Sequence, residues 1–242
     1  MIVDDASEPI SDLLRRNRSW AERKTASDPG FFARLVGQQR PRYFWIGCAD
    51  SRVPATEIVD LDPGEMFVHR NVANLARSDD ASFSAALSYA IETLEIDDIL
   101  LVGHYGCGGI EAVLGGTDGK VARWLTPIRE MYDRRAGDLA ALRRGAKLDR
   151  LCELNVIEQA RALSNHPIVV TAWANGRALS IYGLIYGVGD GLIGHVCTGS
   201  KSESASPRIA VHASYECASE RPDQLGEQGA DPSQFIAMRP GE

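Results

Sequence analysis

The chain has 242 residues, of which 44% are hydrophobic and 24% are charged. This composition is typical of a globular protein, and the length is enough to bury one substantial core. The formal net charge of −7, from 33 acidic and 26 basic side chains, disfavours nucleic acid or an acidic membrane surface as the main partner.

The sequence indicates neither a membrane span nor a secretory signal. No apolar run approaches the roughly 20 residues that cross a bilayer. The N-terminus is acidic and then amphipathic, without the basic start and apolar stretch of a signal peptide, so we expect a cytoplasmic protein. An odd number of cysteines in such a chain predicts reduced thiols, some available to a metal: Cys48, Cys107, Cys152, Cys197 and Cys217.

The first part of the chain predicts a helical arm followed by two strands. Apolar residues at helical spacing predict a helix over residues ~8–26, and a second short helix follows over residues 31–39. We expect this arm, residues ~8–40, to pack against a partner subunit. The continuous apolar run of residues 42–49 predicts a strand buried on both faces, and a second strand lies around residues 66–69.

The middle of the chain alternates between helices and strands. A helix is predicted over residues 82–94, and residues 98–116 predict a strand, a glycine-rich turn and a short helix. Residues ~120–165 are predicted to be helical, with a break near residues 143–147. The apolar run HPIVVTAWA, residues 166–174, predicts a third strand.

The last part of the chain predicts two strands and an extension. Residues 178–197 indicate a strand pair with glycine turns, whereas residues 199–242 are rich in Ser, Gly and Pro and predict an irregular C-terminal extension. Residues 1–198 are therefore predicted to form a single α/β domain whose central, mostly parallel β-sheet is covered by helices. Ligands of such sheets bind beyond the carboxyl ends of the strands, which is where CADSR and GHYGC lie.

Three side chains at these strand ends have the chemistry of a zinc site. His104 and Cys107 form an H-x-x-C pair after one strand, and Cys48 ends another. Two thiolates and an imidazole suit the tetrahedral coordination of zinc. Because three strong ligands leave a fourth position open, the pattern favours a catalytic over a structural site. Cys152 lies in a helical pattern and is predicted to be a small buried side chain.

Asp50 and Arg52 flank the first predicted ligand. An exposed Asp-x-Arg pair is usually of little consequence. Here the guanidinium can hold the carboxylate with two hydrogen bonds, which keeps Asp50 ionised and directed at the open position. If Arg52 releases it, Asp50 can itself become the fourth metal ligand. The sequence of this short turn thus predicts two states of the zinc site: an open one with Asp50 held by Arg52, and a closed one with Asp50 on the metal.

These motifs resemble those of the β-class carbonic anhydrases. The resemblance rests on CADSR, on GHYGCGG about fifty residues later and on FVHRNVAN between them, and it covers residues ~10–195. It implies reversible hydration of carbon dioxide to bicarbonate and a proton. It also implies one Zn²⁺ per chain bound by Cys48, His104 and Cys107, with water or Asp50 in the fourth place. Asp50 and Arg52 would be the catalytic pair that orients the attacking hydroxide.

Within this family the chain resembles the bicarbonate-regulated bacterial subtype. Trp45, Arg70 and Tyr186 match the positions of its non-catalytic, allosteric bicarbonate pocket. Bicarbonate bound there is expected to favour the closed state with Asp50 on zinc, so activity would fall at lower pH and in high bicarbonate. The resemblance further implies a homodimer or a homotetramer, with the active site near the interface between two subunits.

Two other functions remain open. Some relatives with the same zinc motif hydrolyse carbon disulfide or carbonyl sulfide, and access to the pocket, not the ligand set, separates these activities. A non-catalytic zinc or redox sensor would account for the reduced thiols, but it would not need an open fourth position or the Asp50–Arg52 pair. Nucleotide binding at the glycine-rich turn is disfavoured, because neither usual phosphate-binding motif is present.

Overall fold

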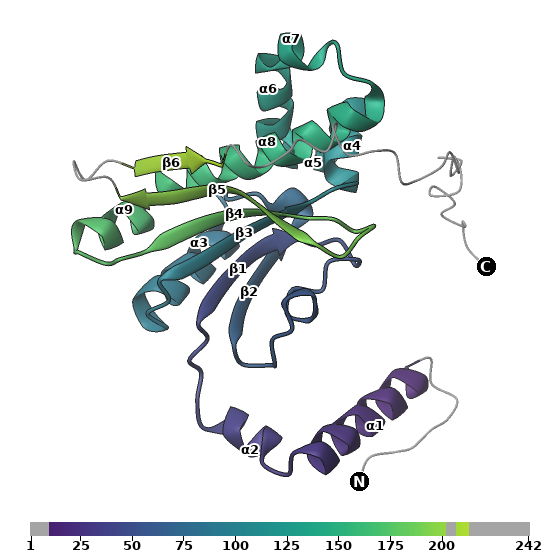
Figure 1. Ribbon diagram of the computed structural model, residues 1–242, viewed down its shortest axis with the longest axis vertical. Helices are drawn as coiled ribbons and strands as arrows, with labels where there is room; N and C mark the ends of the chain where they lie inside the picture. Colours follow the sequence, from purple (N-terminus) through teal and green to yellow (C-terminus); the bar gives the residue numbers. More distant parts are fainter. Residues whose placement is uncertain (1–9, 202–206, 213–242) are drawn as a thin grey trace.

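A single six-stranded sheet forms the centre of the computed structural model, which describes residues 10–201 and 207–212. The strand order is β2-β1-β3-β4-β5-β6 (Figure 1). The pairs β1–β2, β1–β3 and β3–β4 are parallel, and β4–β5 and β5–β6 are antiparallel. The strands are β1 (Tyr43–Cys48), β2 (Met66–Asn71), β3 (Asp98–His104), β4 (Ser180–Tyr186), β5 (Ile193–Lys201) and β6 (Pro207–Val211).

Helices connect and cover the strands, which confirms the predicted α/β class. The α-helices are α1 (Ser11–Ser27), α2 (Phe31–Val36), α3 (Ala81–Ser88), α4 (Gly108–Gly115), α5 (Gly119–Trp124), α6 (Thr126–Arg134), α7 (Ala136–Leu139), α8 (Arg144–Ser164) and α9 (Pro167–Ala174). Shorter helical turns are η1 (Glu57–Val59), η2 (Val72–Asn74) and the π-turn η3 (Tyr89–Thr93). Among the described residues, no helix combines the length and apolarity that crossing a bilayer requires.

The main core lies between α8 and one face of the sheet. α8 contacts β3, β4, β5 and β6. Its side chains Leu151, Val156 and Leu163 join a buried apolar cluster that includes Phe44 and Leu101 from the sheet. Removing this apolar surface from water is the main favourable contribution to folding. α8 is thereby fixed beneath the strands whose ends carry the predicted metal ligands.

A smaller cluster lies on the opposite face of the sheet. There Trp45, Val102 and Tyr186 pack with Val53 and Ala55, which belong to the segment that follows β1. These contacts hold the CADSR segment over the carboxyl ends of the strands.

The N-terminal arm, α1 and α2, extends away from the sheet (Figure 1). α1 buries none of its residues, and Leu13 is 64% exposed. Trp20 packs edge-on against Phe31 and Phe32 of α2, and Lys24 forms an ion pair with Asp62 at 3.2 Å. Because helices in proteins gain most of their stability from packing an apolar face, and the apolar side chains of α1 are exposed, we still expect a partner subunit to cover this arm.

The strand predicted for residues 166–174 is wrong, because residues 167–174 form α9. His166 caps this helix by accepting a hydrogen bond at Nδ1 from the N–H of Ile168, at 3.3 Å. Pro167 stands at the first helical position, where its missing N–H removes no hydrogen bond. A short apolar run suits a buried helix or a buried strand equally, so the capping residues decide.

The prediction of an irregular extension after Thr198 is wrong for the residues that the structure describes there. β5 continues to Lys201, and residues 207–211 form β6, which pairs with β5 and packs Ile209 against the core. The composition of this segment conceals a strand that is stabilised by pairing with a distant part of the chain. Residues 202–206 and 213–242, including Cys217, lie outside the described residues.

We predict that Gly183→Ala destabilises the domain. A Cβ at Gly183 would lie 2.4 Å from Cys197 Sγ and 2.9 Å from Val156, so β4 or α8 must move. The free energy of unfolding should fall by about 1–3 kcal/mol, measured by urea denaturation. Gly145→Ala, on the exposed start of α8 with nothing within 4 Å, is the matched control and should not be destabilising. Equal stability of the two variants would contradict the described packing.

Candidate metal centre

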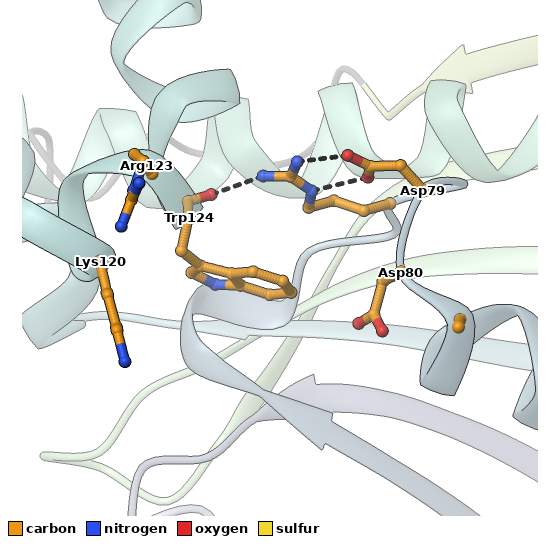
Figure 2. Close-up of a pocket in the computed structure, with 7 residues that line it drawn as sticks. Asp79, Asp80, Lys120, Arg123 and Trp124 are labelled. Carbon is orange, nitrogen blue, oxygen red and sulfur yellow. Dashed lines mark hydrogen bonds and ion pairs between the residues drawn. The ribbon is translucent and has the colours of Figure 1, made fainter.

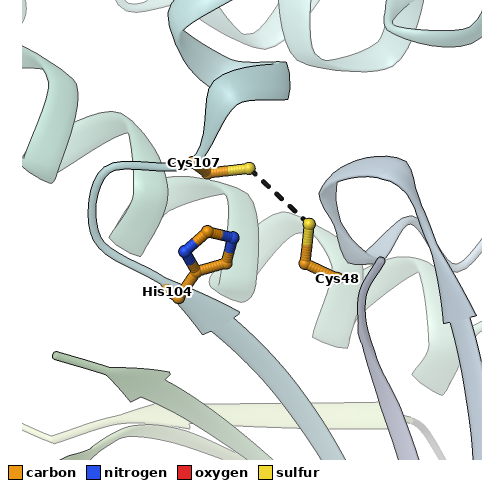
Figure 3. Close-up of side chains that lie close together, drawn as sticks. All are labelled: Cys48, His104 and Cys107. Atoms are coloured by element: carbon orange, nitrogen blue, oxygen red, sulfur yellow. Dashed lines mark hydrogen bonds between the residues drawn. The ribbon is translucent and has the colours of Figure 1, made fainter. Parts of the chain in front are cut away.

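The pairing of β1 with β3 brings two of the predicted ligands to one edge of the sheet. Ile46 lies beside Leu101 in this parallel register, so Cys48 and His104 both stand at the carboxyl ends of their strands. After His104 the chain turns at Gly106, whose φ of 65° lies in the left-handed region that glycine adopts without strain. This turn returns Cys107 to the same point, directly before α4 (Figure 3).

Cys48, His104 and Cys107 form a cluster with the geometry of a metal site. One ligand atom from each lies within 4.8 Å of the other two, and all three residues are buried. The two Sγ atoms are 3.9 Å apart. Tetrahedral zinc with Zn–S distances of about 2.3 Å separates two sulfur atoms by about 3.8 Å. The three residues that the sequence singled out as ligands therefore fit zinc.

His104 is oriented for metal binding. Its Nδ1 donates a hydrogen bond to the carbonyl oxygen of Tyr105, at 3.0 Å. This bond leaves the lone pair of Nε2 available, and Nε2 is buried without a hydrogen-bond partner among the described residues. Buried polar atoms rarely lack a partner. A metal ion bound at Nε2 would satisfy it, in the arrangement usual for metal-binding histidines.

The two thiols interact strongly. The hydrogen bond from Cys107 lowers the pKa of Cys48 to about 4, although burial opposes the shift. The same contact raises the pKa of Cys107, because a second negative charge beside the Cys48 thiolate is unfavourable in a buried site. Without a metal, the pair therefore retains one proton near neutral pH. A divalent cation that binds both sulfur atoms must displace this proton.

Arg52 holds Asp50 beside this cluster. Arg52 Nε and Nη2 donate to the two oxygens of the Asp50 carboxylate at 3.0 and 2.7 Å, and the Arg52 backbone N–H donates to Oδ1 at 2.9 Å. The side-chain bonds hold the pKa of Asp50 well below its usual range, so this carboxylate is ionised. Arg52 also donates to the carbonyl oxygen of Gly106, which joins the two ligand-bearing turns. Asp50 Oδ2 lies 3.8 Å from His104 Nε2.

The residues of the predicted bicarbonate pocket lie on the opposite face of the sheet from α8. Trp45 and Tyr186 are buried in the smaller cluster, and Trp45 Nε1 has no hydrogen-bond partner among the described residues. A Cβ at Gly47 would lie 2.1 Å from this Nε1, so the indole requires glycine there. Arg70 stands beside Gly47 in the adjacent strand.

The side chain of Arg70 binds the metal-site loop. It donates to the carbonyl oxygens of Cys48 and Asp50. Arg70 therefore connects the predicted pocket directly to the backbone that carries a metal ligand and the Asp50 carboxylate.

A set of buried polar residues on α8 is not predicted by the sequence pattern. Glu153, Asn155 and Gln159 interrupt the apolar face of this helix and contact the loops around the metal centre. Polar residues on the apolar face of a predicted helix could have indicated these positions. Their hydrogen-bond partners, however, lie 48 to 83 residues away along the chain.

An open cleft of about 490 Å³ lies elsewhere on the surface (Figure 2). In it Arg77 binds Asp79 through two hydrogen bonds, and its guanidinium lies 5.2 Å from the centre of the Trp124 ring. None of the predicted site residues lines this cleft; its lining is Arg77, Asp79, Asp80, Ala81, Lys120, Arg123 and Trp124. It is separate from the metal centre.

Comparison with known proteins agrees with the geometry of the site. The family model described as "Carbonic anhydrase" matches residues 43–193. A carbonic anhydrase from Emericella nidulans is 40% identical, over 75% of this chain and 80% of its own. The structure of a Coccomyxa β-carbonic anhydrase in complex with acetazolamide is 39% identical, covers 79% of this chain and 87% of its own, and superposes with a TM-score of 0.76. One of the structures of two tetrameric β-carbonic anhydrases from Sordaria macrospora is 35% identical, with 77% and 96% coverage and a TM-score of 0.73.

We predict that metal binding depends on Cys107 and not on another buried thiol. Cys107→Ala removes a ligand, so the purified protein should retain less than about a tenth of the roughly one zinc per chain expected of the wild type. Cys197→Ala, a buried free cysteine in β5, is the control and should keep the full complement. Metal content is measured by inductively coupled plasma mass spectrometry. Equal zinc in the two variants would refute the assigned ligand set.

Proposed function

The chain belongs to the β-class carbonic anhydrases, enzymes of reversible carbon dioxide hydration, and we propose that one Zn²⁺ per chain, held by Cys48, His104 and Cys107, is the centre of that reaction. The observation that carries this proposal is the convergence of two thiols on a buried imidazole nitrogen without a partner among the described residues. Bound zinc supplies a nucleophile near neutral pH, because it lowers the pKa of its water to about 7.

The proposed roles of Asp50 and Arg52 follow from their charges and positions. Asp50 is an ionised acceptor 3.8 Å from His104 Nε2, so it stands at the edge of the ligand set. We assign it the orientation of the attacking hydroxide through a hydrogen bond. Arg52 fixes the carboxylate with two side-chain bonds and is thereby a positioning residue.

We propose that Asp50 also closes the site. If Arg52 releases it, the Asp50 carboxylate is near enough to take the fourth metal position and exclude water. Arg70 links this change to bicarbonate, because its guanidinium now holds the carbonyl oxygens of Cys48 and Asp50. An anion beside Arg70 would compete for those hydrogen bonds. Trp45 Nε1, which has no partner in the part of the chain that the structure describes, and the hydroxyl of Tyr186 are further donors for a bicarbonate ion on this face.

We further propose a homodimer or homotetramer in the cytoplasm. The exposed apolar side chains of α1 and the tetrameric assembly named for the Sordaria relatives support an oligomer. The four described cysteines are all free thiols, which is consistent with a reducing compartment.

We predict that Asp50→Asn lowers kcat/KM for carbon dioxide hydration by about 10²-fold, because the variant loses the charged acceptor at the site. The rate is measured by stopped flow with a pH indicator on protein of known zinc content. Asp79→Asn is the matched control, because Asp79 forms a similar two-bond pair with Arg77 away from the metal centre. Full activity in Asp50→Asn would exclude the assigned role. Wild-type protein with zinc but without turnover would instead refute the proposed reaction at this centre and direct attention to carbon disulfide or carbonyl sulfide.

We predict that Trp45→Phe abolishes inhibition by bicarbonate. Wild-type activity should be higher at about pH 8.5 than at about pH 7, and added bicarbonate should inhibit it more at the lower pH, where the closed state is favoured. The phenylalanine variant lacks the indole N–H and should lose this dependence. Trp173→Phe, whose indole donates to the carbonyl oxygen of Leu179, serves as the control and should stay inhibited. Unchanged bicarbonate inhibition in Trp45→Phe would argue against the regulatory pocket.

A further inference from the structure

One turn of α8 contacts the segments that surround the three proposed zinc ligands. Cys152, Glu153 and Asn155 are buried on this turn, and none of them belongs to the ligand set. We propose that α8 positions the zinc ligands, with Glu153 acting on His104 through Tyr105 and Asn155 acting on Cys48 through Ala73. This inference rests on the zinc centre proposed above.

The first link runs from Glu153 to His104. The hydroxyl of Tyr105 donates to Glu153 Oε1 at 3.0 Å, and the carbonyl oxygen of Tyr105 accepts from His104 Nδ1 at 3.0 Å. Tyr105 is thus held by α8 at its ring and holds the imidazole at its backbone. If the imidazole of His104 rotates and keeps its hydrogen bond, the Tyr105 backbone must move with it. The hydrogen bond between the Tyr105 hydroxyl and Glu153 opposes that movement. Arg150 pairs with Glu153 Oε2 at 2.8 Å and stabilises the buried charge.

The second link runs from Asn155 to Cys48. Asn155 Nδ2 donates to the carbonyl oxygen of Ala73 at 3.0 Å, and the turn η2, which contains Ala73, packs against β1, the strand that ends at Cys48. Ala73 has a φ of 65°, a conformation that non-glycine residues keep only when their surroundings impose it. Gln159 supports the same loop, because it donates to Asn155 Oδ1 at 3.1 Å and accepts from the Ala76 N–H at 2.9 Å.

The third contact concerns Cys107. The helix α4, which begins directly after Cys107, packs against α8, and Cys107 and Cys152 belong to the same buried cluster. The segments that surround the three ligands therefore rest on one rigid helix that the main core fixes in place. Burying a carboxylate and two amides is unfavourable unless each is hydrogen-bonded, and apolar residues of similar size are often as stable. The proposed role in positioning the zinc ligands explains why α8 has polar residues at these buried positions.

The test compares the loss of two buried hydroxyls, one linked to the zinc centre and one not. Tyr105→Phe removes the bond to Glu153, whereas Ser164→Ala removes a buried bond within α8 to the Ala160 carbonyl oxygen, at 2.8 Å. Zinc release from each holoenzyme into excess chelator is followed with a zinc indicator. The unfolding temperature of each variant is measured alongside it, because a purely structural role would change only stability.

We expect Tyr105→Phe to release zinc about tenfold faster than wild type, in the range found when groups behind metal ligands are altered. Ser164→Ala should stay within about twofold of wild type on the same scale. Glu153→Gln keeps an oxygen that can accept from Tyr105 and should release zinc more slowly than Glu153→Leu. Adding Tyr105→Phe to Glu153→Leu should bring no further acceleration, because both changes break one link.

Equal release rates in Tyr105→Phe and Ser164→Ala would overturn the proposal, as would multiplicative effects of Glu153→Leu and Tyr105→Phe. If Glu153→Leu does not fold, the comparison of Tyr105→Phe with Ser164→Ala decides alone. Wild-type protein without zinc is a different result, because it would refute the proposed zinc centre itself.

Discussion

The parallel pairing of β1 with β3 is the constraint on which the metal centre depends. It brings Cys48 and His104 to the same edge of the sheet although they lie 56 residues apart in the sequence. The left-handed turn at Gly106 then returns Cys107 to within 3.9 Å of Cys48, sulfur to sulfur. Cys48 follows Gly47, the partner of Val102, and so stands one position short of His104 along the paired strands; a shift of one residue in this register would displace the two ligands by about 3.3 Å relative to each other. The apolar packing of α8 and the smaller cluster on the other face thus preserve the site because they preserve the register.

Electrostatics sets what the assembled site can do. The site buries two thiols and an imidazole nitrogen that has no partner among the described residues, which is unfavourable. A divalent cation bound by all three groups would remove this unfavourable energy. Outside this buried set, Arg52 holds the negatively charged Asp50 carboxylate at a fixed position beside the ligand His104. The same pair belongs to the turn that Arg70 holds through two backbone carbonyl oxygens. The proposed catalytic pair and the proposed regulation therefore share one short stretch of backbone.

Local patterns predicted the parts of this site that local geometry determines. The H-x-x-C spacing and the apolar runs before Cys48 and His104 identified the ligands, because ligands after parallel strands must meet at one edge. The strand predicted in place of α9 is wrong, since an apolar run of eight residues fits both structures and the capping by His166 selects the helix. β6 was missed because its pairing with β5 is not visible in its composition. The role of Glu153 depends on Tyr105, 48 residues earlier, and only the folded chain shows that contact.

The central claim is that zinc is bound by two thiolates and one imidazole with one position left for a small oxygen ligand. X-ray absorption at the zinc edge of the purified enzyme measures this directly. The account predicts two sulfur neighbours at about 2.3 Å and two nitrogen or oxygen neighbours at about 2.0–2.2 Å. A shell of three or four sulfur atoms, or one without sulfur, would contradict it.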